Sequence, residues 1–287
     1  MEPTARQAIA ARIEQLAALD VLSGPLQKGV RSAVPQESRG KDLLSGTWLG
    51  HPLHPPLTDL VIGAWTSALL LDLLGGDDAE QAADRLIAAG IVAAVPTAAS
   101  GLSDWAELRD ASRRVGTVHA LGNTTALALH ALSWSARRRG RRESAVALSA
   151  LGYGVATFSA WLGGHLSFGK GVGVNQTAFL DAPTEWTAVL GETELAEGTL
   201  TGARADSLRV VLVRTQGLYA LADRCSHRGC SLHEGRLNAD NTVTCPCHGS
   251  TFRLEDGSIV KGPATSPQPA FDVRTSEGKL EIRRRPA

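Results

Sequence analysis

The sequence has no excess of either charge, and it has few cysteines. Its 29 basic residues balance 29 acidic ones, which argues against a nucleic-acid-binding protein. All four cysteines lie between residues 225 and 247, so any thiolate chemistry is confined to that segment. Charged residues are rare in four apolar stretches that approach or exceed the ~20 residues needed to cross a bilayer as a helix. These stretches are Leu57–Leu74, Leu86–Leu102, Val115–Ala136 and Ala145–Phe168.

Two cysteines and two histidines recur at a spacing suited to a metal centre. Cys225 is followed by His227 after one residue, and Cys245 is followed by His248 after two residues. Two thiolates and two imidazoles on neighbouring loops are the ligand set of a Rieske 2Fe-2S centre. The same four ligands could also form a tetrahedral zinc site, so the spacing alone leaves zinc as an alternative.

The residues around these ligands resemble the Rieske family at three places. The segments CSHRGCSLHEG, CPCHGSTF and DGSIVKGPA carry the resemblance, which covers about 100 residues from Glu185 to the C-terminus. It implies a 2Fe-2S cluster with Cys225 and Cys245 on one iron and His227 and His248 on the other. It also implies one-electron transfer. Short β-patterned runs separated by Gly, Asn and Asp turns predict a small antiparallel β domain with the ligand loops at one tip.

The resemblance extends to residues beside the ligands. Cys230 and Cys247 stand where the quinol-oxidising branch of the Rieske family has a disulfide between its two cluster loops. Ser250 matches a serine of that branch whose hydroxyl donates to a bridging sulfide, and Gly262-Pro263 matches a loop that covers the cluster. Phe252 departs from the usual tyrosine, so one donor is missing. We therefore expect a reduction potential between the ferredoxin types and the best quinol oxidisers.

The apolar stretches favour a four-helix transmembrane bundle over a soluble one. Residues 86–99 lack the polar face that a soluble bundle helix needs, and several tryptophans stand near predicted helix ends, where a membrane interface favours indole rings. His51-Pro52-Leu53-His54-Pro55 resembles the HPxHP signature of an uncharacterised four-helix membrane family. The expected fold is therefore an α+β multidomain chain. Its parts are an amphipathic N-terminal helix and linker (1–47), a four-span membrane bundle (48–169), a hinge linker (170–183) and an all-β antiparallel Rieske domain (184–287).

Four histidines are expected at the end of the bundle nearest the cluster: His51, His54, His119 and His165. Ionisable residues inside a membrane are costly and suggest a function. We expect a b-type haem on His119 and His165, or on one of these with His51 or His54. A different metal site in the same histidines, or a set of hydrogen bonds between helices, are the alternatives.

These features predict a multi-pass membrane protein that moves single electrons between quinol or a membrane-bound haem and a protein acceptor. The alternatives are a membrane-tethered ferredoxin-like carrier that serves an oxygenase, and a redox or metal sensor. The basic run over residues 137–142 favours a cytoplasmic loop and hence an extracytoplasmic Rieske domain. The chain lacks the facial triad of a mononuclear iron oxygenase, so we expect no catalytic residue of its own.

Overall fold

The computed structural model describes residues 5–286 and separates into two compact units. One is formed by residues up to 34 together with 53–172, and the other by residues 35–52 together with those from 173 onward. The chain therefore crosses between the units three times, whereas the predicted boundaries place one hinge at 170–183. The first four residues of the predicted N-terminal helix lie outside the described residues.

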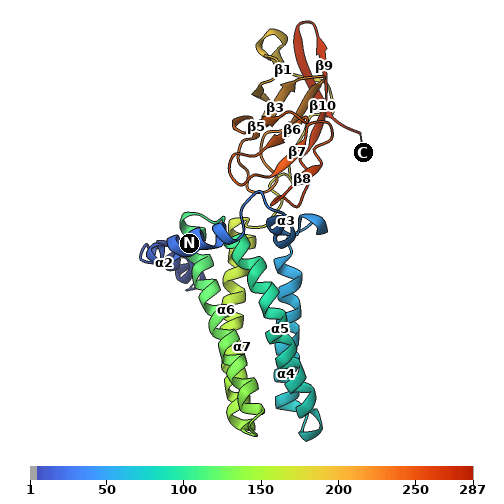
Figure 1. Ribbon diagram of the computed structural model, residues 1–287. Helices are drawn as coiled ribbons and strands as arrows, with labels where there is room; N and C mark the ends of the chain where they lie inside the picture. Colours follow the sequence, from blue (N-terminus) through green and yellow to red (C-terminus); the bar gives the residue numbers. More distant parts are fainter. Residues whose placement is uncertain (1–4, 287) are drawn as a thin grey trace. The chain divides into compact units, whose positions relative to one another are not determined.

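Four long helices form the body of the first unit (Figure 1). Helix α4 packs along α5 and α6 packs along α7, while contacts between α5 and α6 and between α4 and α7 complete the group. Each helix contains most of one predicted apolar stretch. Their bounds are α4 His54–Leu74, α5 Glu80–Trp105, α6 Asp110–Arg137 and α7 Arg142–Gly164.

These helices place polar groups inside and apolar groups outside. Ser100 and Ser159 are fully buried, whereas large apolar side chains such as Leu73, Val92 and Leu151 are more than half exposed. Small residues between helices and apolar side chains on the outer face suit packing in lipid.

Among the described residues, three helices are long and apolar enough to cross a membrane: His54–Leu74, Asp77–Trp105 and Arg142–Gly169. Helix α6, the predicted third span, is not among them. Its middle carries His119, Asn123 and His130, which lower its hydropathy. The predicted combination of a helical region with candidate membrane helices and a following β domain is confirmed.

Two N-terminal helices pack on one end of the long helices. They are α1 Ala5–Gln15 and α2 Leu19–Ala33. Gln27 donates to the carbonyls of Trp105 (3.2 Å) and Leu108 (2.9 Å), so it satisfies acceptors left open at the end of α5. Asp20 accepts from Arg114 on α6 at 2.6 Å. The segment expected to be a linker is therefore largely helical.

A buried charge network joins the opposite ends of the same four helices. Arg137 of α6 contacts Asp72 of α4 and Asp84 of α5, the latter at 2.8 Å, and Arg142 of α7 reaches Asp84 at 2.6 Å. The side chains of Arg137 and Asp72 are 1% and 0% exposed. Arg137 also donates to Ser149 at 3.2 Å. Each helix thus contributes at least one charged side chain, and the buried guanidinium has the acceptors that its desolvation requires.

The second unit contains two antiparallel sheets (Figure 1). The six-stranded sheet has the order β1-β10-β9-β4-β3-β2, and the four-stranded sheet has the order β5-β6-β7-β8. Both sheets lie in the predicted antiparallel β domain. The strands are β1 Thr187–Gly191, β2 Leu200–Ala205, β3 Leu208–Arg214, β4 Leu218–Ala222, β5 Arg236–Asn238, β6 Thr242–Thr244, β7 Thr251–Arg253, β8 Ile259–Lys261, β9 Ala270–Ser276 and β10 Lys279–Arg284.

A hydrophobic core joins the two sheets beneath the ligand loops. Val211 and Leu221 of the large sheet share this core with Phe252 of the small one. Cys225 and Cys245 belong to the same core. The two predicted cysteine ligands are therefore part of the buried core of this second unit, here called the β unit.

Candidate metal centre

The two ligand loops repeat one backbone pattern. In the first, the amide of Cys225 donates to the carbonyl of Cys230 (2.9 Å), and the amide of Gly229 donates back to Cys225 (2.8 Å). In the second, Cys245 donates to Ser250 (2.8 Å), and Gly249 donates back to Cys245 (3.2 Å). Gly229 and Gly249 have φ of 76° and 80°, a left-handed conformation that favours glycine. Each cysteine therefore begins a tight loop closed by a glycine.

This loop geometry directs backbone amides at both cysteine sulfurs. The amides of His227 and Arg228 donate to the sulfur of Cys225, and those of Cys247 and His248 donate to the sulfur of Cys245. In each loop the donors are the residues two and three positions after the cysteine. A nest of amides stabilises negative charge on sulfur, as a thiolate ligand requires.

Both cysteines are buried and free, and their sulfurs lie within hydrogen-bond reach of each other. This shared hydrogen bond raises the pKa of the Cys225 thiol and lowers the pKa of Cys245 to about 7. The rings of His227 and His248 are in edge-to-face contact, with centroids 5.1 Å apart and planes at 90°. The structure thus brings together all four predicted ligands.

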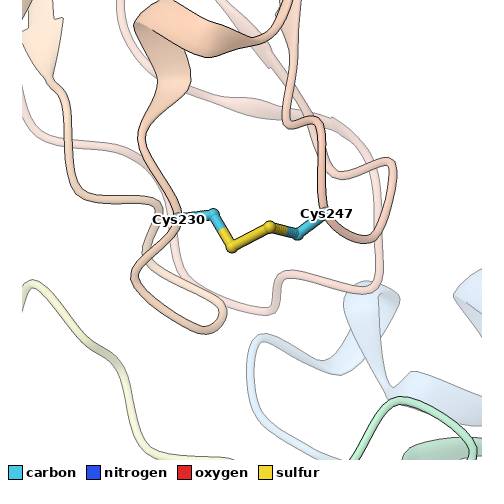
Figure 2. The surroundings of a disulfide bond; sticks show 2 residues. All are labelled: Cys230 and Cys247. Atoms are coloured by element: carbon cyan, nitrogen blue, oxygen red, sulfur yellow. A yellow bond between two sulfur atoms is a disulfide. The ribbon is translucent and has the colours of Figure 1, made fainter. Parts of the chain in front are cut away.

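A disulfide joins the two loops (Figure 2). The sulfurs of Cys230 and Cys247 are 2.03 Å apart, and their Cα atoms are 6.4 Å apart. Because each cysteine lies within a few residues of ligands on its own loop, the bond limits how far the loops can separate. The predicted pairing is present in the structure.

A third loop closes on the second through Ser250. The amide of Ala264 donates to the hydroxyl oxygen of Ser250 at 3.0 Å, and both residues are fully buried. Since this oxygen accepts from Ala264, the hydroxyl proton of Ser250 can be donated elsewhere. Gly262-Pro263, the predicted covering segment, immediately precedes Ala264, and its peptide bond is cis.

Gln268 holds the first loop, and sequence reasoning missed it. Its amide nitrogen donates to the carbonyls of Ala222 (2.6 Å) and Arg224 (2.7 Å). Its oxygen accepts from the amide of Ser226 at 2.9 Å. Gln268 is 1% exposed, so these contacts are shielded from water. No motif marks this residue, because its partners lie more than 40 residues away in the chain.

Of the four histidines predicted to bind haem, His54 and His119 are in ring contact. Their centroids are 6.3 Å apart with an interplanar angle of 81°. The Nδ1 of His54 donates to the carbonyl of Thr97 (3.0 Å), and that of His119 donates to the carbonyl of Ser159 (2.7 Å). A carbonyl can only accept, so both Nδ1 atoms carry protons and the lone pair of each ring lies on Nε2. The Nε2 of His119 accepts a hydrogen bond from the side-chain amide of Asn123 at 3.1 Å, so a metal there would have to displace this donor.

The other two histidines have different surroundings. The Nε2 of His165 lies 3.0 Å from Glu14, which also contacts Lys170 at 2.7 Å. Burial opposes ionisation of Glu14, but these hydrogen bonds outweigh it and lower the pKa of the carboxyl. His51 is exposed and belongs to the β unit.

The donor set fits a 2Fe-2S cluster. It offers two buried neighbouring thiols, two adjacent imidazoles and amides aimed at each sulfur, which is the ligation that a Rieske cluster uses. The amides are of particular value because hydrogen bonds to cluster sulfurs stabilise the reduced, more negative state.

Comparison with known proteins divides the chain in the same way. Residues 185–273 match the model of the Rieske [2Fe-2S] domain, and residues 50–176 match that of a predicted membrane protein family, DUF2231. The 3-phenylpropionate/cinnamic acid dioxygenase ferredoxin subunit of Shigella flexneri is 38% identical over 81 residues, which are 28% of this chain and 76% of that protein.

Two further proteins are similar over the C-terminal part. The terminal oxygenase component of carbazole 1,9a-dioxygenase from Sphingomonas sp. is 34% identical over 102 residues, covering 35% of this chain and 24% of the other. The solved ferredoxin of carbazole 1,9a-dioxygenase from Nocardioides aromaticivorans is 25% identical, covers 35% of this chain and 98% of its own, and has a TM-score of 0.33. Through its C-terminal unit the chain belongs to the Rieske [2Fe-2S] family, and this unit follows a DUF2231 membrane-type domain.

Proposed function

We propose that this protein is a membrane-anchored carrier that moves single electrons between a membrane donor and a protein acceptor. The observation that carries the proposal is the convergence of Cys225, Cys245, His227 and His248 in a chain that also holds candidate membrane helices. We expect no catalytic residue in this role. The chain's task is to hold the redox centre and to set its potential.

The four ligands would hold the cluster, which supplies a one-electron couple when bound. Two neutral imidazoles in place of thiolates leave less negative charge on the centre and so raise its potential. The amides of residues 227 and 228, and those of 247 and 248, offset the charge of the two thiolates. The Cys230–Cys247 disulfide keeps the two loops from separating between the oxidised and reduced states.

We propose quinol as the donor. Ser250 has a proton to donate because its oxygen already accepts from Ala264. A hydroxyl donor and a disulfide between the ligand loops are the features that resemble the quinol-oxidising branch. A hydrogen bond from Ser250 to a cluster sulfur would stabilise the reduced cluster and so raise its reduction potential. A high reduction potential is what the cluster needs to accept an electron from quinol.

A b-type haem at His54 and His119 is the second cofactor that we propose. His54 and His119 would hold such a group through their Nε2 atoms, with Asn123 displaced from His119. The support for the proposal is that these two rings, from α4 and α6, are neighbours with centroids 6.3 Å apart. Such a group would supply a second one-electron couple.

The haem proposal predicts a Soret band in protein purified after haem-replete expression. His119→Ala should remove the band, whereas His165→Ala should retain it because His165 is held by Glu14. Wild-type protein without a Soret band would refute a haem at this pair.

A second function, electron delivery to an oxygenase, is favoured by the relatives. The proteins that match the C-terminal unit include a dioxygenase ferredoxin subunit and a terminal oxygenase component. In that role the helices would serve only as an anchor. Quinol would then fail to reduce the cluster, and a ferredoxin reductase would succeed.

We also propose that the β unit faces the extracytoplasmic side. A disulfide persists in oxidising compartments, and the loop after α6 keeps three arginines outside the buried charge network: Arg138, Arg139 and Arg141. A membrane-impermeant amine reagent applied to intact cells should label lysines of the β unit. Labelling that appears only after lysis would contradict this orientation.

The decisive experiment uses full-length protein in lipid nanodiscs. Electron paramagnetic resonance of the dithionite-reduced sample should show a Rieske signal. Addition of a reduced quinone analogue should then produce the same signal without dithionite. Absence of the first signal would refute the electron-transfer proposal, and absence of the second alone would favour the oxygenase carrier.

A further inference from the structure

A short segment that precedes the membrane helices is part of the β unit. Residues 35–52, here called the strap, group with the C-terminal residues rather than with the helices on either side in the chain. The strap contains helix α3, Arg39–Ser45, whose start is capped by Ser38 accepting from the amide of Lys41 at 3.1 Å. Gly46 ends this helix in a left-handed conformation. The helix of the strap is thus capped at both ends by residues of the strap itself.

The strap packs on the loop that covers the predicted cluster. The carboxylate of Asp42 accepts from the amide of Gly262 at 2.8 Å. Gly262 leaves no room for a side chain, because a Cβ there would lie 2.1 Å from the hydroxyl of Thr47 and 3.1 Å from Asp42. The two segments are therefore in direct contact, although they lie 220 residues apart in the chain.

The contact between Asp42 and Gly262 is connected to Ser250 through two further residues of the chain and one hydrogen bond. Only Pro263 separates Gly262 from Ala264, and the proline ring fixes one backbone angle between them. The amide of Ala264 donates to the hydroxyl of Ser250, and the carbonyl of Ser250 accepts from the ligand Cys245. Each residue in this series holds the next through a backbone or hydroxyl hydrogen bond.

We propose that Asp42 is a positioning residue that sets the reduction potential of the cluster through the 262–264 loop and Ser250. The inference rests on the proposed function, because it requires the cluster at the four ligands. With Asp42 in place, Ala264 holds the oxygen of Ser250, and the hydroxyl proton is directed at the cluster. Without it the loop loosens, Ser250 donates less well, and the potential falls because the reduced state loses a hydrogen bond.

The charge of Asp42 would act in the opposite direction. A carboxylate near the cluster disfavours the extra electron, so removing its charge alone would raise the potential. Asp42→Asn keeps an oxygen acceptor without the charge, whereas Asp42→Ala removes both. The two substitutions therefore separate position from charge.

The test is a redox titration of the full-length protein followed by paramagnetic resonance. We expect Asp42→Ala to reduce the ratio of reduced to oxidised cluster at a fixed potential by about threefold, a shift of about 28 mV downward at 59 mV per tenfold change. Asp42→Asn should not lower the potential. Glu37→Gln is the control in the strap: its carboxylate is 57% exposed and pairs with Arg236 at 3.9 Å, so removing this charge should not lower the potential.

A double substitution tests the route. In a Ser250→Ala background, Asp42→Ala should cause no further fall, because the two residues act on one hydrogen bond. An undiminished effect in that background, or an equal upward shift for both Asp42 variants, would overturn the proposal. If Asp42→Ala fails to assemble the cluster, Asp42→Glu, which displaces the carboxylate by one methylene, should shift the potential in the same direction. An absent Rieske signal in the wild type would instead refute the proposed function.

Discussion

Replacing Gln268 with leucine should open the first ligand loop without touching a ligand. The substitution removes three hydrogen bonds, to the carbonyls of Ala222 and Arg224 and from the amide of Ser226. Leucine has a volume similar to that of glutamine, so the substitution removes hydrogen bonds and changes the packing little. At about 1 kcal/mol for each hydrogen bond, the loop loses about 3 kcal/mol of stability against local opening. That is roughly a 100-fold rise in the open population.

Hydrogen exchange followed by mass spectrometry measures this opening directly. Peptides covering residues 223–232 should exchange roughly 100-fold faster in the variant, whereas peptides from the membrane helices should not change. Gln216→Leu, the same substitution at an exposed turn between β3 and β4, is the control and should alter stability by less than about 0.5 kcal/mol. A change below threefold in the loop peptides would show that Gln268 does not hold the loop.

Three further substitutions or conditions test other parts of the structure. Replacing Cys230 and Cys247 with serine should destabilise the ligand loops by about 3 kcal/mol, as estimated for a closed loop of this size, and thermal loss of the cluster absorbance would report it. Asp72→Asn should cost about 3 kcal/mol because Arg137 stays buried with one carboxylate fewer, and a Tm unchanged in detergent would contradict this. The hydrogen bonds from Arg114 and Arg113 lower the pKa of Asp20 to about 2 from 3.8, so its contribution to stability is present above 3.8 and is lost as the pH falls toward 2. Proteolysis of α1 and α2 should therefore accelerate across that window in the wild type and stay constant in Asp20→Asn.

The ligand set could be predicted because each pair of ligands is local in sequence. One or two residues separate Cys225 from His227 and Cys245 from His248, and a tight loop with a left-handed glycine brings each pair together. Gln268 and Asp42 escaped prediction for the opposite reason. Their partners lie 42 and 220 residues away, and a single amide or carboxylate carries no spacing signal.

The membrane region shows a similar division between what spacing can and cannot predict. Hydropathy predicted the positions of all four long helices, because an apolar run of about 20 residues is typical of a helix that spans a membrane. It could not show which histidines meet, since residues at one depth can face different neighbours. His119 and His165 share a depth in the prediction, yet His119 meets His54 while His165 meets Glu14. The segment around Pro25 was expected to be a linker, but contacts such as Gln27 with the end of α5 keep it helical.

The reduction potential decides between the two proposed partners. A carrier that serves an oxygenase must be able to reduce it, so its cluster needs a low reduction potential. A carrier that takes electrons from quinol needs a cluster with a high reduction potential. The relatives of known function include a ferredoxin subunit, but the similarity to it covers 28% of this chain. The Cys230–Cys247 disulfide and the proton of Ser250 both favour a higher potential, while Phe252 supplies no hydroxyl donor.

These features predict a midpoint above about −100 mV, within the range of roughly −150 to +300 mV that Rieske centres span. Ser250→Ala should lower it, because the reduced cluster loses a hydrogen bond to sulfide. Phe252→Tyr should raise it if the added hydroxyl reaches a cysteine sulfur. A wild-type midpoint below −100 mV, unchanged in Ser250→Ala, would assign the protein to the ferredoxin-like carriers, because neither the disulfide nor the serine would then be setting the potential of the cluster.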